Sequence, residues 1–195
     1  MIERKLMLVE RIMYVDPETP LNCVFTAKIQ GKIAEEHIRN ALAKIQGKHP
    51  LLRSVIEMMD TKHPHFVVKE GMESIPLQIV ERKTEQDWLI VSECEWYHPF
   101  SKDNKPLARL VWIKGEDVSE LLWMLPHCIC DGTSIVTLMR ELLSLLDNPN
   151  QELQPYPLFK SVNDFLPQGF EPQKKSRKAK RYLLLARLFF FLQRK

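Results

Sequence analysis

The chain has 195 residues, of which 45% are hydrophobic and 27% are charged, a size and composition typical of one soluble globular domain or one large lobe. Its four cysteines have no regular spacing, so we expect no disulfide framework and a reducing, cytoplasmic setting. The N-terminus is punctuated by charges, and no segment has the roughly 18 consecutive apolar residues of a membrane span, so we expect neither a signal peptide nor an integral membrane protein.

The net charge of +3 is divided unevenly along the chain. From Lys174 onward there are nine Lys or Arg residues and no acidic residue, which leaves 19 basic and 25 acidic side chains, a net charge of −6, in residues 1–173. The overall charge therefore says little about the ligands of the body of the protein. The basic cluster lacks the interleaved aromatic residues of a nucleic-acid platform, so we expect no nucleic-acid partner.

A strand pattern and a helix pattern follow one another early in the chain. Residues 21–32 are rich in β-formers and close on Gly31, which predicts a strand. Residues 33–50 predict an amphipathic helix that is ended by Gly47 and Pro50. The apolar face of this helix comprises Ile33, Ile38, Ala41, Leu42 and Ile45.

More strands and a second helix are predicted next. Residues 51–60 and 63–70 flank a polar pair and predict a hairpin, and residues 75–82 predict a further strand. Thr84 precedes Asp87 by three residues, which resembles a capping box and predicts the start of a helix at this point.

A hairpin and the strongest helix pattern of the chain come after that. Residues 106–126 are rich in β-formers on both sides of a tight turn at residues 115–117, which predicts an antiparallel hairpin. The next helix is predicted to begin at Thr133 and to stop at Asn148-Pro149. Its apolar stripe comprises Ile135, Leu138, Met139, Leu142 and Leu146. The alternation of strands and helices predicts an α+β or α/β layer with a mixed sheet.

No regular helix or strand pattern directly follows this helix in the sequence. Five of the 13 prolines fall between Pro149 and Pro172, which predicts a linker or an extended surface crossing. We therefore divide the chain into a lobe at residues 1–148, a Pro-rich crossover at residues 149–173 and a basic amphipathic helix at residues 174–195.

The sequence LPHCICDGTS, residues 125–134, lies where a predicted strand gives way to a predicted helix. Residues 127–132 therefore form a strand-to-helix connection, a place where functional side chains are often held by a rigid scaffold. Asp131 is placed to cap the helix, whose free N–H groups and partial positive charge face the loop. Gly132 permits a close backbone approach or a positive φ.

Four interpretations of this loop compete. His127, Cys128, Cys130 and Asp131 are all metal-ligand types, but no second half of a zinc site is present, so we expect no metal. A redox pair of Cys128 and Cys130 would be strained at a separation of two residues, and cysteine is often a small buried hydrophobe. His127 fits a general base, because its pKa lies near working pH. The remaining alternative is a histidine with satisfied hydrogen bonds beside a helix cap.

The loop resembles the H-x-x-x-D-G motif of the chloramphenicol-acetyltransferase-like superfamily of acyltransferases, which includes the condensation domains of nonribosomal peptide synthetases. Further segments of the superfamily are matched in order. The matched positions are His49, Pro50, Leu52 and Arg53 early in the chain, Pro99, Phe100, Pro106, Leu107 and Arg109 before the motif, and Ser134, Glu141 and Leu142 after it.

The resemblance implies an α+β fold, an α/β sandwich with a mixed, largely antiparallel sheet covered by helices, forming one lobe of a two-lobed protein. It implies that His127 is the general base, that Asp131 is structural and held by an arginine, and that Gly132 supplies backbone geometry near the thioester. Ser134, Arg53 and Arg109 would support the site. The positive end of the helix that follows would favour the developing oxyanion.

The implied reaction moves an acyl group from a thioester to the hydroxyl or amine of a small molecule. The thioester would be an acyl-CoA or a phosphopantetheine-linked acyl group on a carrier protein, and no tightly bound cofactor is implied. Pro126 stands in place of the first histidine of the condensation-domain motif, Lys105 in place of a glycine, and Ser101 in place of an aspartate. The second lobe and its D-F-G-W-G motif are absent, so a partner lobe is expected; the alternative is a non-catalytic lobe that binds a carrier protein or a sister lobe.

The basic tail has two interpretations. Residues 180–195 combine Lys and Arg with a short Leu- and Phe-rich stretch, which suits peripheral contact with a membrane surface. We favour the alternative that these residues pack on the missing lobe, because exposed apolar patches usually mark a partner.

Overall fold

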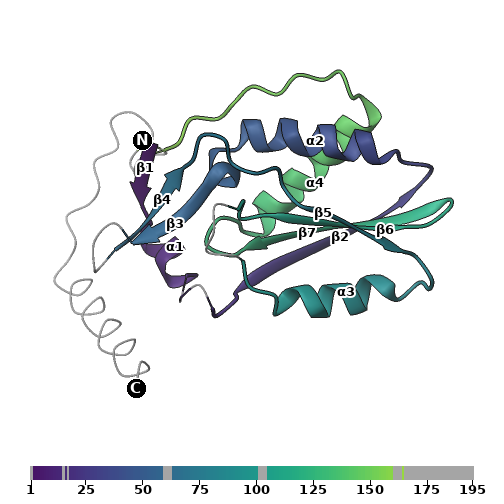
Figure 1. Cartoon of the computed structure of the whole chain (residues 1–195), viewed down its shortest axis with the longest axis horizontal. Coiled ribbons are helices and arrows are strands. Elements are labelled where there is room, and N and C mark those ends of the chain that lie inside the picture. The colour runs from purple at the N-terminus through teal and green to yellow at the C-terminus, as the bar shows by residue number, and fades with distance from the viewer. Residues whose placement is uncertain are drawn as a thin grey trace. The chain divides into compact units, whose positions relative to one another are not determined.

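The computed structural model describes residues 2–14, 16, 18–58, 63–100, 105–159 and 164. The chain divides into two compact units, Met1–Asp164 and Phe165–Lys195, and the described residues belong to the first of them (Figure 1). The elements of this unit, in chain order, are β1 (Ile2–Lys5), α1 (Leu8–Ile12), β2 (Asn22–Gln30), α2 (Glu35–Lys48), the 3₁₀ helix η1 (Pro50–Arg53), β3 (Ser54–Met58), β4 (Pro64–Val68), β5 (Leu77–Glu81), α3 (Asp87–Trp96), β6 (Arg109–Lys114), β7 (Val118–Pro126) and α4 (Gly132–Asp147).

The larger sheet has four strands in the order β2-β7-β6-β5. Its longest pairing joins β2 and β7, from Asn22 opposite Pro126 to Gln30 opposite Val118. β6 and β7 form the predicted antiparallel hairpin, whereas β5 pairs with β6 in parallel. The expectation of a mixed, largely antiparallel sheet is confirmed.

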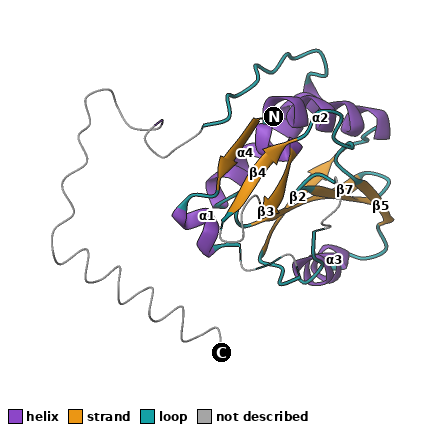
Figure 2. Ribbon diagram, turned by 60° about the vertical axis from the view of Figure 1, so that its left-hand side comes forward, coloured by secondary structure: helices purple, strands orange, loops and turns teal. Residues whose placement is uncertain are grey.

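Helices cover both faces of this sheet, as Figures 1 and 2 show. On one face, Trp112 and Trp123 pack into a core with residues of α2 and α4. On the other face, Val111 and Met124 pack against α3 through Trp88 and other partly buried residues. Because both faces are buried, β6 and β7 are nearly continuous runs of hydrophobic residues rather than alternating ones.

A second, smaller sheet has the strand order β1-β4-β3, and both of its pairings are antiparallel. The β3–β4 pair is the predicted hairpin. β1 and α1 were not predicted. Arg4 of β1 binds Glu10 of α1 through two contacts of 2.6 Å, and its guanidinium lies 4.9 Å from the centre of the Phe66 ring, so tertiary contacts stabilise this N-terminal part.

The predicted helices are present, but their ends and their buried faces differ from the predictions. α2 runs through Gly47 and ends at Lys48, since one glycine inside a helix costs only about 1 kcal/mol relative to alanine. α4 begins at Gly132, one residue earlier than expected. Its buried stripe contains Leu145 in place of the expected Leu146, which is half-buried.

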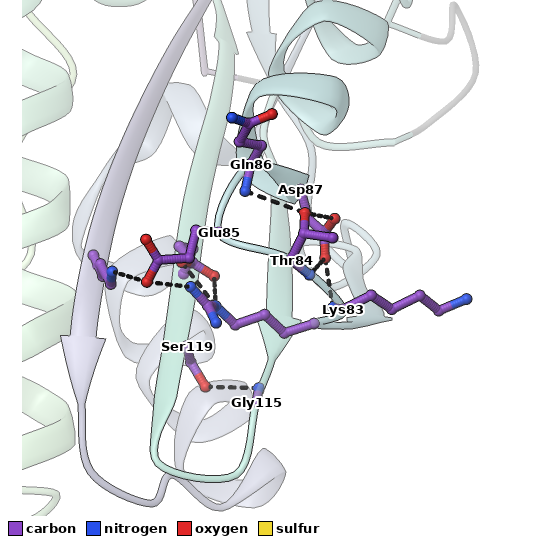
Figure 3. A network of polar contacts seen from close by, with 10 residues as sticks. Lys83, Thr84, Glu85, Gln86, Asp87, Gly115 and Ser119 are labelled. Carbon is purple, nitrogen blue, oxygen red and sulfur yellow. Dashed lines mark hydrogen bonds and ion pairs between the residues drawn. The ribbon is translucent and has the colours of Figure 1, made fainter.

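The capping box expected at Thr84 is wrong, because α3 begins only at Asp87 (Figure 3). The Asp87 carboxylate instead closes the turn before the helix. It accepts hydrogen bonds from the Thr84 hydroxyl at 2.6 Å, the Thr84 backbone N–H at 2.9 Å and the Lys83 backbone N–H at 2.5 Å. These bonds lower the pKa of Asp87 to about 2.

The turn between β6 and β7 requires a glycine. A Cβ on Gly115 would lie 2.1 Å from the carbonyl oxygen of Val118, a distance that any other residue at this position would have to relieve by moving the backbone. The Gly115 N–H also donates to the Ser119 hydroxyl at 3.4 Å, a contact that Figure 3 shows across the turn.

The segment after α4 has no helix or strand up to Phe159 and is fastened to α2. Lys44 of α2 donates to the carbonyls of Pro149 at 2.8 Å and Gln151 at 3.0 Å. The Tyr156 N–H donates to the Lys48 carbonyl at 2.8 Å. This part of the predicted crossover therefore lies on the lobe itself.

The other boundaries of the predicted domain division, at residues 173 and 174, fall outside the described residues and stay predictions, as does the amphipathic helix at residues 174–195. Among the helices that the structure describes, none is long and apolar enough to cross a membrane.

Candidate functional site

The loop between β7 and α4 begins directly at the end of the longest strand pair. The His127 N–H donates to the carbonyl of Leu21 at 2.7 Å, and the Ile129 N–H donates to the carbonyl of Pro126 at 3.0 Å. These two bonds continue the β2–β7 ladder into a tight turn. The predicted strand-to-helix connection is confirmed, and it is held by the backbone on both sides.

The imidazole of His127 has a fixed orientation. Its Nδ1 lies 2.8 Å from the carbonyl oxygen of Cys130. A carbonyl only accepts, so Nδ1 carries the proton, and in the neutral ring Nε2 keeps its lone pair. Burial of the ring opposes protonation, but the bond to Cys130 and the charges of Cys23 and Asp131 raise the pKa of His127 above its ordinary value of 6.5.

Asp131 caps α4. Its Oδ1 accepts a hydrogen bond from the Ser134 N–H at 2.7 Å and from the Ser134 hydroxyl at 2.7 Å. These bonds lower the pKa of Asp131, so the side chain is an anion at the positive end of the helix. The expected cap is confirmed. The expectation that an arginine holds Asp131 stays a prediction, because the hydrogen bonds to its side chain within the described part of the chain come from Ser134.

Replacement of Asp131 by alanine is expected to lower the free energy of unfolding by about 0.5–2 kcal/mol, the usual cost of losing a helix cap. Urea unfolding followed by circular dichroism measures the loss. Asp131→Asn is the matched control, because asparagine caps about as well as aspartate. Equal destabilisation by both variants would show that the carboxylate does more than cap the helix.

Gly132 does not have a positive φ, one of the two features that glycine was expected to permit here. It is the first residue of α4, and the glycines with positive φ among the described residues are Gly31 and Gly71. A Cβ on Gly132 would meet no described atom within 4 Å. Open space, rather than a left-handed backbone, is the local feature that glycine provides here.

Arg109 fastens a segment that lies before the loop in sequence. Its guanidinium contacts the Glu95 carboxylate at 2.8 Å and donates to the carbonyls of His98 at 2.9 Å and Pro99 at 3.0 Å. The Phe100 ring lies 4.0 Å from the guanidinium carbon. Arg109 therefore supports the chain before β6 rather than Asp131.

Two further residues matched by the resemblance have different surroundings. Arg53 lies in η1 and, among the described residues, its Nε is buried without a hydrogen-bond partner. His49 binds Glu141 of α4, with Nε2 and Oε2 separated by 2.7 Å, and Lys48 binds the other oxygen of the same carboxylate at 2.6 Å. The matched segments around His49 and Glu141 are thus brought together between α2 and α4.

A hollow opens beside His127. Its lining combines loop residues with residues of the N-terminal helix and its C-cap, and comprises Val9, Glu10, Met13, His127, Cys128, Ile129, Cys130, Asp131 and Ser134. The structure thus brings together His127, Asp131 and Ser134, and it adds α1, which sequence patterns missed. α1 is only five residues long, has no buried residue and exposes Leu8, Val9 and Ile12, so it looks like a surface turn in sequence.

A second hollow shares Met13 and Cys128 with the first. Phe100, which Arg109 contacts, lies in its wall together with Tyr14 and Asn22. Asn22 donates to the carbonyls of Glu95 at 3.0 Å and His98 at 2.8 Å. Phe100, one of the matched residues, therefore lies in a wall that also includes Cys128 of the loop.

The cysteines of the loop differ from one another. Cys128 is buried, and burial raises its pKa to about 12, as expected of a packing residue. Cys130 is also buried, and its thiol donates a hydrogen bond to the carbonyl of Pro126 at 3.7 Å. Across the described residues, no three His, Cys, Asp or Glu side chains are grouped as metal ligands.

The helix-covered mixed sheet carries the His127 loop between its inner strand β7 and the following helix α4. The Condensation domain family matches residues 16–182. The chain belongs to this family.

Curated relatives are long proteins that this chain matches in part. Surfactin synthase subunit 1 of Bacillus subtilis (strain 168) is 29% identical over 150 residues, which make up 73% of this chain and 4% of that protein. Bacitracin synthase 3 of Bacillus licheniformis is 29% identical over 138 residues, or 70% of this chain and 2% of that protein.

Solved structures share the fold. The epimerization domain from the third module of tyrocidine synthetase B has a TM-score of 0.68 and 18% identity, over 85% of this chain and 40% of that one. The first condensation domain of the calcium-dependent antibiotic synthetase also has a TM-score of 0.68, with 14% identity, over 80% of this chain and 40% of that one. The chain therefore spans well under half of the proteins that it resembles in structure.

Proposed function

We propose that this chain is the catalytic lobe of a condensation-type acyltransferase, which moves an acyl group from a thioester to an amine or hydroxyl. The orientation of His127 is the observation that carries this proposal. Its Nδ1–H is held by the Cys130 carbonyl, so the neutral ring presents Nε2 as a base. The hollow beside the ring leaves room for a reacting group.

In this mechanism, Nε2 of His127 takes a proton from the attacking amine or hydroxyl. The attacking atom forms a bond to the thioester carbon, and the carbon–sulfur bond then breaks, releasing a thiol that recovers the proton. The positive end of α4 favours the negative charge that develops on the carbonyl oxygen. Asp131 and Ser134 keep that helix end in place, and the open space at Gly132 admits the thioester.

A thioester on the phosphopantetheine arm of a carrier protein is our preferred donor. Condensation domains of nonribosomal peptide synthetases use such donors, and the matched relatives are surfactin and bacitracin synthases. We further propose that a second lobe completes the site, since the chain spans 40% of the similar solved structures. All four cysteines are free thiols, which supports a cytoplasmic reaction.

The test is an acyl-transfer assay with the intact protein. One acyl group is offered either on a phosphopantetheine-loaded carrier protein or on CoA, together with an amine or an alcohol acceptor. We expect product with the carrier-bound donor. Product from CoA alone would assign the other donor class, and carrier binding without product from any donor would favour the non-catalytic lobe.

The rate is expected to rise with pH through the pKa of His127, above pH 6.5. The base must be neutral, and the contacts of the ring raise its pKa, so the protonated, inactive form persists to a higher pH than for a free histidine. A profile of kcat/KM against pH measures this midpoint in the free enzyme. A rate that falls as pH rises through this range would contradict the role of a base.

A further inference from the structure

Met13 lies between the two hollows of the site. It is the C-cap of α1, and it lines the hollow beside His127 as well as the second hollow. Among the described residues, Cys128 is the other side chain that lines both hollows. A route from one hollow to the other therefore passes these two side chains.

The two side chains differ in how deeply they are buried. Cys128 is 3% exposed and packs with Leu6, Phe66 and Leu107 in a core cluster. Met13 is half-buried and packs against the same cluster, next to a helix of five residues that has no buried residue. An unbranched thioether side chain also adapts to irregular space. A change in the size of residue 13 therefore alters the hollows at less cost to the core than a change at residue 128.

The second hollow has a mostly apolar lining. Its apolar and aromatic residues are Met13, Tyr14, Pro20, Leu21, Val55, Ile56, Phe100, Leu107, Pro126 and Cys128. The polar side chains bind groups of the protein itself. Asp16 accepts hydrogen bonds from the Thr19 N–H at 2.7 Å and hydroxyl at 2.9 Å, and the Asn22 amide donates to two carbonyls. A hydrocarbon chain fits such a lining better than a polar group, which would lose its hydrogen bonds to water.

The walls of the second hollow away from Met13 are held in place by the fold. β3 supplies Val55 and Ile56. The Phe100 ring lies 4.0 Å from the guanidinium carbon of Arg109, which is itself paired with the buried Glu95. Because these walls are fixed, the size of the Met13 side chain decides how much room a ligand finds between the two hollows.

We propose that Met13 sets the length of the acyl chain that this lobe accepts, an inference that rests on the proposed function. The thioester carbon lies in the hollow beside His127, where Nε2 serves as the base. A saturated acyl tail extends from there past Met13 into the second hollow. The space that Met13 leaves limits the length of that tail, so Met13 is a specificity-determining residue for an aliphatic acyl substrate.

The experiment measures kcat/KM of the intact protein for thioesters with saturated acyl chains of increasing length, on the carrier protein or CoA, whichever donor is active. We expect the values to rise with length and then to fall sharply beyond a limiting length. Met13→Ala should move the limit to longer chains, and Met13→Phe should move it to shorter ones. Each buried methylene group is worth about fourfold, so Met13→Ala should favour a chain about two methylene groups beyond the limit by about tenfold or more.

Met58→Ala is the matched control, because Met58 is 57% exposed at the end of β3 and lines neither hollow. Its length profile should equal that of the unchanged protein, and a melting curve checks that each variant is folded. The same limiting length in Met13→Ala, Met13→Phe and the unchanged protein would overturn the inference. An equal shift caused by Met58→Ala would overturn it as well.

A binding measurement separates this inference from the proposed function. Pantetheine thioethers with alkyl tails of the same lengths have no acyl group to transfer, and isothermal titration calorimetry measures their Kd. The Kd should show the same limiting length and the same shifts in the Met13 variants. Absence of acyl transfer from every donor would overturn the proposed function, while the Kd series would still decide the role of Met13. Thioethers that do not bind, or that bind regardless of length, would overturn that role.

Discussion

His127→Ala is expected to reduce acyl transfer by the intact protein by about 10²- to 10⁴-fold, the usual contribution of a positioned general base. The imidazole Nε2 is the group that takes the proton, and alanine leaves no base in its place. The backbone N–H of residue 127 still donates to Leu21, so the fold should persist. Turnover of a carrier-bound thioester measures the loss, and circular dichroism with a melting curve checks the fold.

The matched control for this variant is His37→Ala. His37 lies on the exposed side of α2, so its loss should change neither turnover nor melting. Full turnover by His127→Ala would assign the lobe to binding rather than catalysis. Loss of turnover together with loss of the fold would instead make His127 a structural residue.

Glu120→Ala is expected to lower the free energy of unfolding by about 3–5 kcal/mol, the usual cost of breaking a buried ion pair from one side. Glu120 is 2% exposed and its partner Arg82 is 17% exposed. The Arg82 Nε lies 3.0 Å from each carboxylate oxygen. Without Glu120, the ion pair left to the guanidinium among the described residues is a 4.0 Å contact with the exposed Glu85.

Urea unfolding at neutral pH measures this loss. The matched control is Glu35→Ala, which breaks the exposed Arg39–Glu35 pair on α2 and should cost about 0.5 kcal/mol or less. The double variant Arg82→Leu with Glu120→Leu should recover much of the stability, because it leaves no unpaired buried charge. Equal effects of Glu120→Ala and Glu35→Ala would contradict the burial argument.

The elements that the sequence predicted are those whose pattern is set locally. The run from Leu121 to Leu125 is fully apolar because both faces of β7 are covered, and such a run between turn residues indicates a strand. β1 was missed because three of its four residues, Glu3, Arg4 and Lys5, are charged, and such a segment has no strand pattern. Its place at the sheet edge depends on contacts with Phe66 and Glu10.

In the candidate site, too, some features follow from local sequence and others depend on contacts between distant residues. Asp131 and Ser134 are three residues apart, so the cap follows from local sequence. The hydrogen bond between the His127 N–H and the Leu21 carbonyl depends on the pairing of two distant strands, which no local pattern encodes. The contact between Arg109 and Glu95 at the end of α3 likewise joins residues 14 positions apart, so the sequence did not predict it.

The pairing of β2 with β7 sets the order in which the protein can be completed during synthesis. β2 is made early, but its partner emerges from the ribosome only about a hundred residues later, after roughly 5–20 seconds at ordinary translation rates. Until then both edges of β2 lack a neighbour from the larger sheet. Contacts between distant residues also slow folding. β7, which precedes the His127 loop, is therefore the last strand of this sheet to be made. A pause in translation before Pro126 would leave a chain with most of its helices but without the candidate functional site.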